Sequence, residues 1–462
     1  MNAFRNRWLI AMLAAAFMAL GPSPARSART EPIALSLERA IELGLENDEA
    51  LRQAMEGVEG ARAEVAQARS NALPHLTISG QYGRNILKPA FFLPEEFREG
   101  PDSPAKVEIG EDNEFYGQAT VTQILWAAGR LSAGLVAAEE FLSSYQMQER
   151  AVADYVRFSV KEAYFTALLA QCALDIENRA MAETEEAARI ARASFEQGTV
   201  SRFDLMRAEV ELANRKAPLV KARNDYDQAL FTLCRRCGLD LDAEIELTDS
   251  LEMTDRPENL EGLIGAMRET SAEIRALEHY IAARKQFLRI AKAERYPMLQ
   301  LSAYYGIQTQ WSEGFTPDEE LIAKVAAVQV GLQIPIFDGF NAKGKINKAA
   351  AALRSAELDL ERVNRDKELA VRQSWLALEN AVTALEGRRE AVALAEEAHR
   401  LALVRLENGL ATPLERLDAE LAMSVARVQL AESLFSYRIA LALLELTVGS
   451  EGYSATDKVS VN

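Results

Sequence analysis

The sequence has few of the residues on which most enzyme active sites and metal centres depend. Its 462 residues include three histidines, His75, His279 and His399, which lie far apart with no nucleophile–base pair or metal-ligand spacing around them. No glycine-rich phosphate loop of the Walker type occurs. We therefore expect no enzymatic activity, no metal site and no cofactor.

Cysteine is equally scarce. Three cysteines are too few for a disulfide framework in a chain of this length. Cys234 and Cys237 have the C-x-x-C spacing of redox and metal sites, but no histidine or second cysteine pair lies near them in the sequence to complete a metal shell. A buried position near a helix end is the simpler interpretation, and a redox or metal role is the alternative. Cys172 lies on an apolar stripe with Tyr164 and Leu168, where a small core residue is expected.

The sequence also lacks an apolar run long enough for a membrane helix. The run over residues 8–20 is shorter than the roughly 20 residues that a bilayer requires. It follows Arg5 and Arg7 and precedes a segment of small residues that ends at Ala25, which is the layout of a secretory signal. We predict a signal peptide over residues 1–25 and export of the chain, with a short membrane anchor as the alternative.

Basic residues are fewer than acidic ones. The chain has 52 Lys and Arg against 69 Asp and Glu, a formal net charge of −17, and loss of Arg5 and Arg7 with the signal peptide would make it more acidic. Nucleic acid is therefore not an expected partner, because its phosphates attract basic surfaces. The interior or the surface should instead prefer cations.

What the sequence does contain is an internal duplication. Residues 68–83, around Pro74, match residues 291–306, around Pro297, without a gap and at an offset of 223 residues. Such internal similarity indicates a repeated structural unit. We therefore expect two equivalent halves.

Two later matches extend the duplication. Residues around Gly129 match those around Gly339, and residues around Gly198 match those around Gly409, at offsets of 210 and 211 residues. The smaller offset places an insertion in the first half, within the proline-rich loop 84–113.

Alternation of apolar and polar residues predicts strands. Leu76 and Ile78 alternate with Thr77 and Ser79, for example, which is a period of two. Such strands fit either a half-buried soluble sheet or a barrel with lipid outside and water inside, and the pattern alone does not separate the two. The four predicted strands cover about residues 75–88, 113–125, 298–308 and 325–337.

Most of the remaining sequence is rich in Ala, Glu, Arg and Leu and predicts helices. Two of them, over residues 130–197 and 340–408, could each extend about 100 Å at about 1.5 Å per residue. Both end at a glycine turn, and a helix of about half the length returns from each turn. Two more half-length helices, over residues 37–72 and 260–295, lead into the strands, so that each half can form a pair of equal columns.

These elements divide the chain. We predict a first repeat over residues 35–237, a connector over 238–259 that lies outside the helices at mid-length, a second repeat over 260–449 and a tail over 450–462 without helical pattern. The expected junctions between strands and helices are marked by Pro74, Gly129, Pro297, Pro335 and Gly339.

Four strands from one chain cannot close a membrane barrel, so copies would have to pool their strands. The chain resembles the TolC-like outer-membrane efflux proteins, or outer membrane factors, in the order, duplication and spacing of its motifs. These motifs are the two strand starts that follow a proline, the segment 333–340, and the turns Gly198-x5-Asp204 and Gly409-x5-Glu415. The resemblance covers about residues 35–449.

That resemblance implies an α+β membrane protein: a duplicated repeat of long α-helical hairpins plus two β-strand pairs, assembled as a homotrimer. Its 12-stranded β-barrel would lie in the lipid of the outer membrane and continue as an α-helical barrel in the periplasm. The implied function is a passive duct in a tripartite efflux or type I secretion system, working with a periplasmic adaptor protein and an inner-membrane transporter.

The resemblance also implies site residues. In the family, acidic side chains just after the second-repeat turn narrow the tunnel, and these match Glu415 and Asp418, with Asp204 in a supporting place. For Glu415 and Asp204, helix capping is an alternative role. The turns at Gly198 and Gly409 would form the periplasmic tip that meets the adaptor.

A periplasmic coiled-coil tether is the alternative function, since adaptor proteins also use long helical hairpins. The four predicted strands between the helices favour the channel. A tether would also fractionate with the periplasm without detergent.

Overall fold

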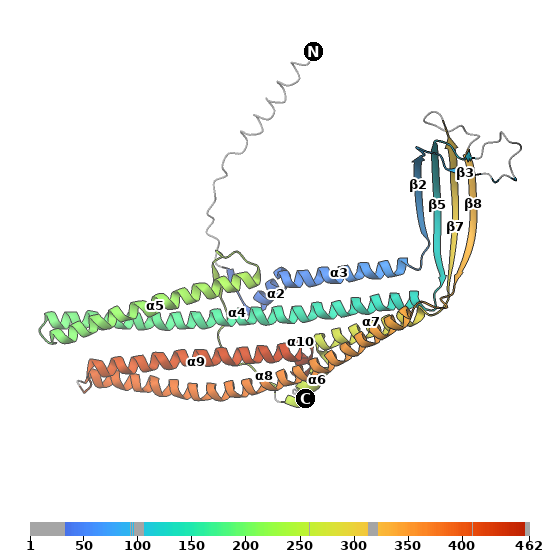
Figure 1. The fold of residues 1–462 in the computed structure, drawn as a ribbon. Helices are drawn as coiled ribbons and strands as arrows, with labels where there is room; N and C mark the ends of the chain where they lie inside the picture. The colour runs from blue at the N-terminus through green and yellow to red at the C-terminus, as the bar shows by residue number, and fades with distance from the viewer. Residues whose placement is uncertain are drawn as a thin grey trace, which may run out of the picture.

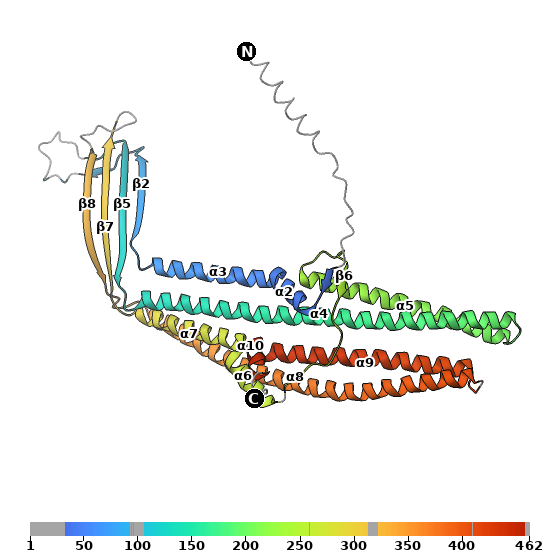
Figure 2. The same cartoon turned by 180° about the vertical axis from the view of Figure 1, so that it is seen from behind.

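The structure is a computed structural model that describes residues 33–92, 94, 96, 106–257, 259–312, 322–408 and 410–457. The signal peptide predicted over residues 1–25 lies outside these residues. Two long helical hairpins run side by side, and a β-sheet rises from one end of them at a steep angle (Figure 1). The view from behind shows the same two layers of hairpins, with the turns at the end opposite the sheet (Figure 2).

The long hairpins confirm the predicted duplication. Helices α4 (Arg130–Glu196) and α8 (Asn341–Glu407) each have 67 residues, and their partners α5 (Arg202–Cys237) and α9 (Pro413–Val448) each have 36. Each long helix packs against its own partner, and α4 also packs against α9, which joins the two repeats. Equivalent residues of the two hairpins lie 211 positions apart, as the element bounds require.

The half-length helices that lead into the strands are each interrupted, which corrects the prediction of single helices over 37–72 and 260–295. The first divides into α2 (Leu37–Asn47) and α3 (Glu49–Ser70), and the second into α6 (Leu260–Thr270) and α7 (Ala272–Ala293). Asp48 adopts an extended conformation, and its carboxylate accepts hydrogen bonds from the amides of Ala50 and Leu51. A short polar side chain thus caps the second helix and ends the first.

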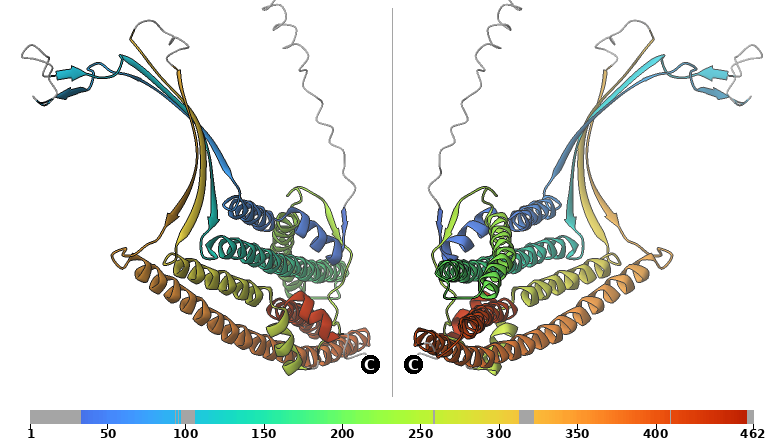
Figure 3. Two further views of the ribbon diagram at one scale, coloured as in Figure 1. Left: turned by 90° about the vertical axis from the view of Figure 1, so that its right-hand side faces the viewer. Right: turned by 90° about the vertical axis from the view of Figure 1, so that its left-hand side faces the viewer.

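The sheet contains one strand pair from each repeat, in the antiparallel order β2–β5–β7–β8. The inner strands β5 (Asn113–Trp126) and β7 (Met298–Trp311) hydrogen-bond to each other, while β2 (His75–Arg84) and β8 (Ile322–Gln333) form the two edges. Seen along the helices, the sheet is curved and twisted (Figure 3).

Two strands end earlier than predicted. Strand β2 ends at Arg84 rather than near 88, and β8 ends at Gln333 rather than near 337. Pro335 follows β8 closely and carries no amide hydrogen to continue a ladder. The loop 84–113 also contains a small antiparallel pair, β3 (Ala90–Phe92) and β4 (Lys106–Glu108), which projects from the far end of the sheet (Figure 3).

Cross-strand register sorts the sheet into one apolar and one polar face, as the alternation predicts. Ile78 lies opposite Ala119, which lies opposite Tyr305 on the next strand. On the other face, Ser79 lies opposite Gln118. The apolar face is uncovered in the single chain, where Ile78 is 81% and Val328 is 73% exposed.

At mid-length part of the connector packs against the first repeat. Strand β6 (Ile245–Leu247) pairs in parallel with β1 (Ile33–Leu35), and both pack on a core that includes α2, α4 and α5. The hydroxyl of Tyr164 on α4 lies 2.7 Å from the carboxylate of Asp249, which also accepts a 2.7 Å hydrogen bond from the amide of Leu37. Burial raises the pKa of Tyr164, so the hydroxyl keeps its proton.

Residues 450–457 are helical, which corrects the prediction of a tail without helical pattern for the described part of that segment. After Gly449 ends α9, the chain forms α10 (Ser450–Asp457) and packs against α6. A Cβ on Gly452 would lie only 2.3 Å from the side chain of Thr270. This close approach shows that tertiary packing, rather than sequence periodicity, stabilises α10.

Among the described residues, no helix combines the length and the apolar character needed to cross a bilayer.

Candidate channel tip and repeat junctions

The first hairpin turn is closed by backbone hydrogen bonds around Gly198. The amide of Thr199 donates to the carbonyl of Ser194 at 2.9 Å, which is the i to i−5 bond of a Schellman motif. Gly198 has φ 76°, and a Cβ there would meet no atom within 4 Å. Glycine is therefore favoured by the left-handed backbone and not by lack of space.

The second hairpin turn repeats this bond. The amide of Leu410 donates to the carbonyl of Arg405 at 2.7 Å, again from i to i−5. Gly409, the expected counterpart of Gly198, lies outside the described residues. The shared bond nevertheless shows that both hairpins reverse by the same backbone device.

Asp204 belongs to the start of α5. Its carboxylate accepts from the amide of Ser201 at 3.3 Å, and the hydroxyl of Ser201 accepts from the amide of Asp204 at 3.2 Å, a complete capping box. The same carboxylate accepts from the hydroxyl of Ser201 at 2.7 Å. These contacts place Asp204 at the helix start, as the capping alternative predicts.

Glu415 and Asp418 lie on the first two turns of α9. The amide of Glu415 donates to the hydroxyl of Thr412 at 3.3 Å, and its carboxylate lies 3.6 Å from the guanidinium of Arg405. Asp418 is exposed, and within the described part of the chain its side chain takes part in no hydrogen bond or ion pair. Of the three predicted tip carboxylates, Asp418 is thus the one without a hydrogen bond or ion pair to its carboxylate among the described residues.

The strand-to-helix junctions use left-handed residues in pairs. Ala128 and Gly129 have φ 51° and 78°, while Gly339 and Phe340 have φ 64° and 68°. Because α4 and α8 begin directly after these pairs, Gly129 is equivalent to Phe340 and Gly339 to Ala128. The sequence match of Gly129 with Gly339 is therefore wrong by one residue. Each junction contains two left-handed residues, and glycine is the second of the pair in the first repeat and the first of the pair in the second repeat.

Three prolines lie next to strand ends. Pro74 directly precedes β2 and Pro297 directly precedes β7, while Pro335 lies two residues after the end of β8. Each proline thus lies where the chain passes between a helix and a strand of the sheet.

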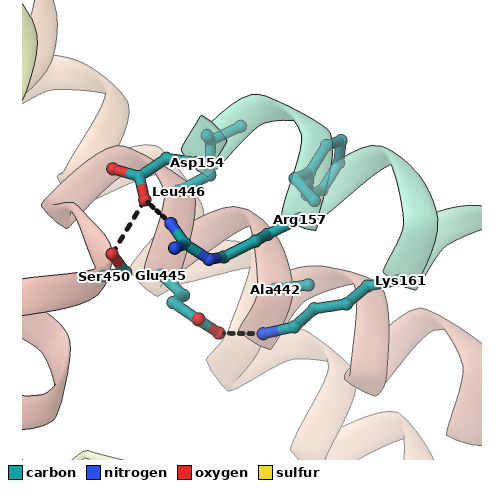
Figure 4. A pocket seen from close by; sticks show the side chains of 8 residues that line it. Asp154, Arg157, Lys161, Ala442, Glu445, Leu446 and Ser450 are labelled. Carbon is teal, nitrogen blue, oxygen red and sulfur yellow. Dashed lines mark hydrogen bonds and ion pairs between the residues drawn. The ribbon is translucent and has the colours of Figure 1, made fainter. Parts of the chain in front are cut away.

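A cluster of polar side chains joins the repeats at mid-length (Figure 4). Lys161 on α4 forms a 2.5 Å ion pair with Glu445 on α9, and the carboxylate of Asp154 contacts Arg157 at 2.6 Å and the hydroxyl of Ser450 at 2.8 Å. Sequence reasoning missed these partners because Lys161 and Glu445 belong to different repeats, and no local pattern links them.

Cys234 and Cys237 are free and buried in the mid-length core. Burial raises the pKa of the Cys237 thiol to about 12 and also raises that of Cys234. Such thiols stay protonated and are poor nucleophiles and metal ligands. The geometry favours the core interpretation of the C-x-x-C pair.

Comparison with known proteins agrees with this architecture. The family model described as outer membrane efflux protein matches residues 40–239 and 263–450. The two matched segments correspond to the two structural repeats and leave out the connector between them. The chain belongs to this family.

Individual relatives extend the likeness over nearly the whole chain. The alkaline protease secretion protein AprF of Pseudomonas aeruginosa is 23% identical over 447 residues, covering 94% of this chain and 88% of AprF. The protein CyaE of Bordetella pertussis is 27% identical over 367 residues, covering 78% and 72%. The crystal structure of the Campylobacter jejuni CmeC outer membrane channel has a TM-score of 0.75 at 17% identity, covering 92% of this chain and 88% of CmeC.

The predicted family, fold class and location are thereby confirmed. The chain is an outer-membrane protein that extends into the periplasm, with the duplicated fold of TolC-like channels. It is a channel component of an efflux or type I secretion system, and its family is one of ducts and not of enzymes.

Proposed function

We propose that three copies of this chain assemble into one passive duct from the periplasm to the exterior. The observation that carries the proposal is the four-stranded sheet, whose two edges are unpaired and whose apolar face is uncovered among the described residues. Open edges are not tolerated in lipid, because backbone groups must be hydrogen-bonded there. Three such sheets would close a barrel of 12 strands with the apolar face toward lipid and the polar face toward water.

The helical hairpins would continue this barrel as a periplasmic tunnel. Their turns at Gly198 and Gly409 would form the tip that meets a periplasmic adaptor, and an inner-membrane transporter would supply the energy. AprF is named for protease secretion and the family for efflux, and one passive duct serves either cargo class, because a duct contributes little substrate chemistry of its own.

Within that tunnel, we assign the constriction to Asp418, with Glu415 beside it. Three copies would bring three Asp418 carboxylates around the axis, and a ring of carboxylates favours cations. Asp204 would contribute less, because its carboxylate is engaged in capping α5.

The test of the assembly is planar-bilayer conductance of the detergent-purified mature protein, with the oligomer mass measured on the same sample. We expect stable, cation-preferring steps from a trimer. A soluble monomer without conductance, recovered from the periplasm without detergent, would replace this proposal with the tethering function.

The constriction is tested by removing one charge at a time. Asp418→Asn should weaken cation preference and change single-channel conductance, because the uncompensated charge is lost. Asp204→Asn is the matched control: it removes the same charge, keeps a side-chain oxygen that can accept from the amide of Ser201 in the capping box, and should change ion selectivity less. Unchanged selectivity in Asp418→Asn trimers would remove Asp418 from the constriction.

A further inference from the structure

Three potential metal ligands meet between the two hairpins, about two turns from the second hairpin turn. They are Glu183 on α4, His399 on α8 and Glu420 on α9, and one ligand atom from each lies within 4.8 Å of the other two. Packing of α9 against both α4 and α8 brings them together. Because the three residues are far apart in the sequence, their spacing along the chain could not have predicted this cluster.

Glu420 is buried without the hydrogen bonds that such a group requires. Its side chain is 2% exposed, and neither carboxylate oxygen has a hydrogen-bond partner within the described part of the chain. The guanidinium of Arg416 lies 3.6 Å from one of these oxygens, an ion-pair distance too long for a hydrogen bond. An unpartnered buried carboxylate is costly and is rare in native structures.

The imidazole of His399 has the same deficit. Its Nε2 atom is buried and lacks a hydrogen-bond partner among the described residues. Two basic side chains are near the cluster, Arg416 and Arg215, and both partly offset the acidic charge at Glu420. Arg215 is itself held by Glu177 at 4.0 Å and by Glu211 at 3.4 Å.

A shared proton explains only part of this arrangement. Burial, reinforced by the carboxylate of Glu183, raises the pKa of Glu420 to about 7. A protonated Glu420 could donate to Glu183, but that proton would leave Nε2 of His399 without a partner. A cation bound by all three side chains would satisfy both carboxylates and the imidazole together.

We propose that Glu183, His399 and Glu420 form a binding site for a divalent transition-metal cation of the zinc type. Two carboxylate oxygens and one imidazole nitrogen suit Zn²⁺ or Co²⁺, whereas Mg²⁺ and Ca²⁺ prefer oxygen ligands alone. Ligand bonds of about 2.0–2.2 Å require only that the three side chains close slightly around the ion. The bound ion would link α4 of the first repeat to α8 and α9 of the second, and so hold the two hairpins together near the tip.

The site can be tested by zinc titration of the detergent-purified, EDTA-treated and dialysed protein, prepared without a polyhistidine tag. Isothermal titration calorimetry should give one zinc ion per chain. His399→Gln and Glu420→Gln should each weaken zinc affinity by about tenfold or more, since loss of even an outer-shell partner costs about 10–100-fold. Glu183→Gln removes the third ligand at a less buried position and should have the same effect, which keeps the test decisive if a buried variant misfolds.

Two control variants separate this site from general zinc binding. Glu209→Gln changes the equivalent of Glu420 in the first hairpin, which is partly exposed and paired with Arg192 at 2.6 Å. His279→Gln changes a histidine that contacts a single carboxylate, Glu140, at 2.8 Å. Neither control should alter zinc affinity.

Cobalt provides a second readout. Co²⁺ bound to the wild-type protein should give visible absorption bands that His399→Gln abolishes, and zinc should raise the thermal unfolding midpoint of the wild-type protein but not of the ligand variants. Absence of zinc binding by the folded wild-type protein would overturn the site and leave the shared proton as the explanation. Zinc affinity in the three ligand variants equal to that of the wild-type protein would also overturn it.

Discussion

Glu209 and Glu420 occupy equivalent positions on α5 and α9, yet their surroundings differ. Glu209 is partly exposed and forms an ion pair with Arg192, whereas Glu420 is buried and lies beside His399 and Glu183. The first-repeat equivalent of His399 is the buried Ala188. The two hairpins therefore share a backbone conformation, but near the turns the side chains between their helices differ.

At mid-length the same two hairpins are alike. Val160 and Val371 are equivalent and fully buried, and so are Leu233 and Leu444. Duplication thus preserved the apolar residues that hold each hairpin together, while residues near the tip diverged. At these positions, apolar packing is the same in both hairpins at mid-length and differs near the turns.

The largest expected effect tests the equivalent core positions of the two hairpins. Leu233→Ala and Leu444→Ala should each lower the free energy of unfolding by about 2–5 kcal/mol, because each removes a fully buried side chain and leaves a cavity. Denaturant unfolding in detergent measures both. Leu394→Ala, at an exposed position of α8, serves as control and should have little effect. A small loss for only one core variant would show that the two cores are not equivalent.

A smaller effect distinguishes the two helix starts. Ser201→Ala should cost about 1–2 kcal/mol, because it breaks a complete capping box. Thr412→Ala should cost about 0.5–1 kcal/mol, since the carboxylate of Glu415 approaches Arg405 instead of closing a box. Unfolding midpoints measure the difference, and Ser201→Asn, which keeps a capping acceptor, should lose little. Equal losses at both positions would contradict the asymmetry.

The smallest effect concerns the exposed ion pair of the first hairpin. Glu209→Gln should change the free energy of unfolding by less than about 0.5 kcal/mol, because water and salt screen the pair with Arg192. Unfolding at low and high salt would check this, and the difference from wild type should shrink as salt increases. A loss above 1 kcal/mol would mean that the pair is shielded from solvent in the assembled protein.

Short-range patterns determined much of the architecture. The alternation around Ile78 and the uninterrupted helical sequence after Gly129 depend on neighbouring residues, so strands, long helices and their duplication were predictable from the sequence. The turn at Gly198 and the capping signature at Ser201 were readable for the same reason. Chain-local preferences also placed Asp418 on α9.

Only the tertiary structure decided what those elements bring together. The helix α10, the ion pair of Lys161 with Glu445 and the meeting of Glu183, His399 and Glu420 all join segments far apart in the chain. Which left-handed residues are equivalent at the two strand-to-helix junctions also became clear only from the residues at which α4 and α8 begin. Local sequence sets the conformational preference of each segment, but long-range packing selects which distant side chains are buried together, and that selection leaves no periodic signal in the sequence.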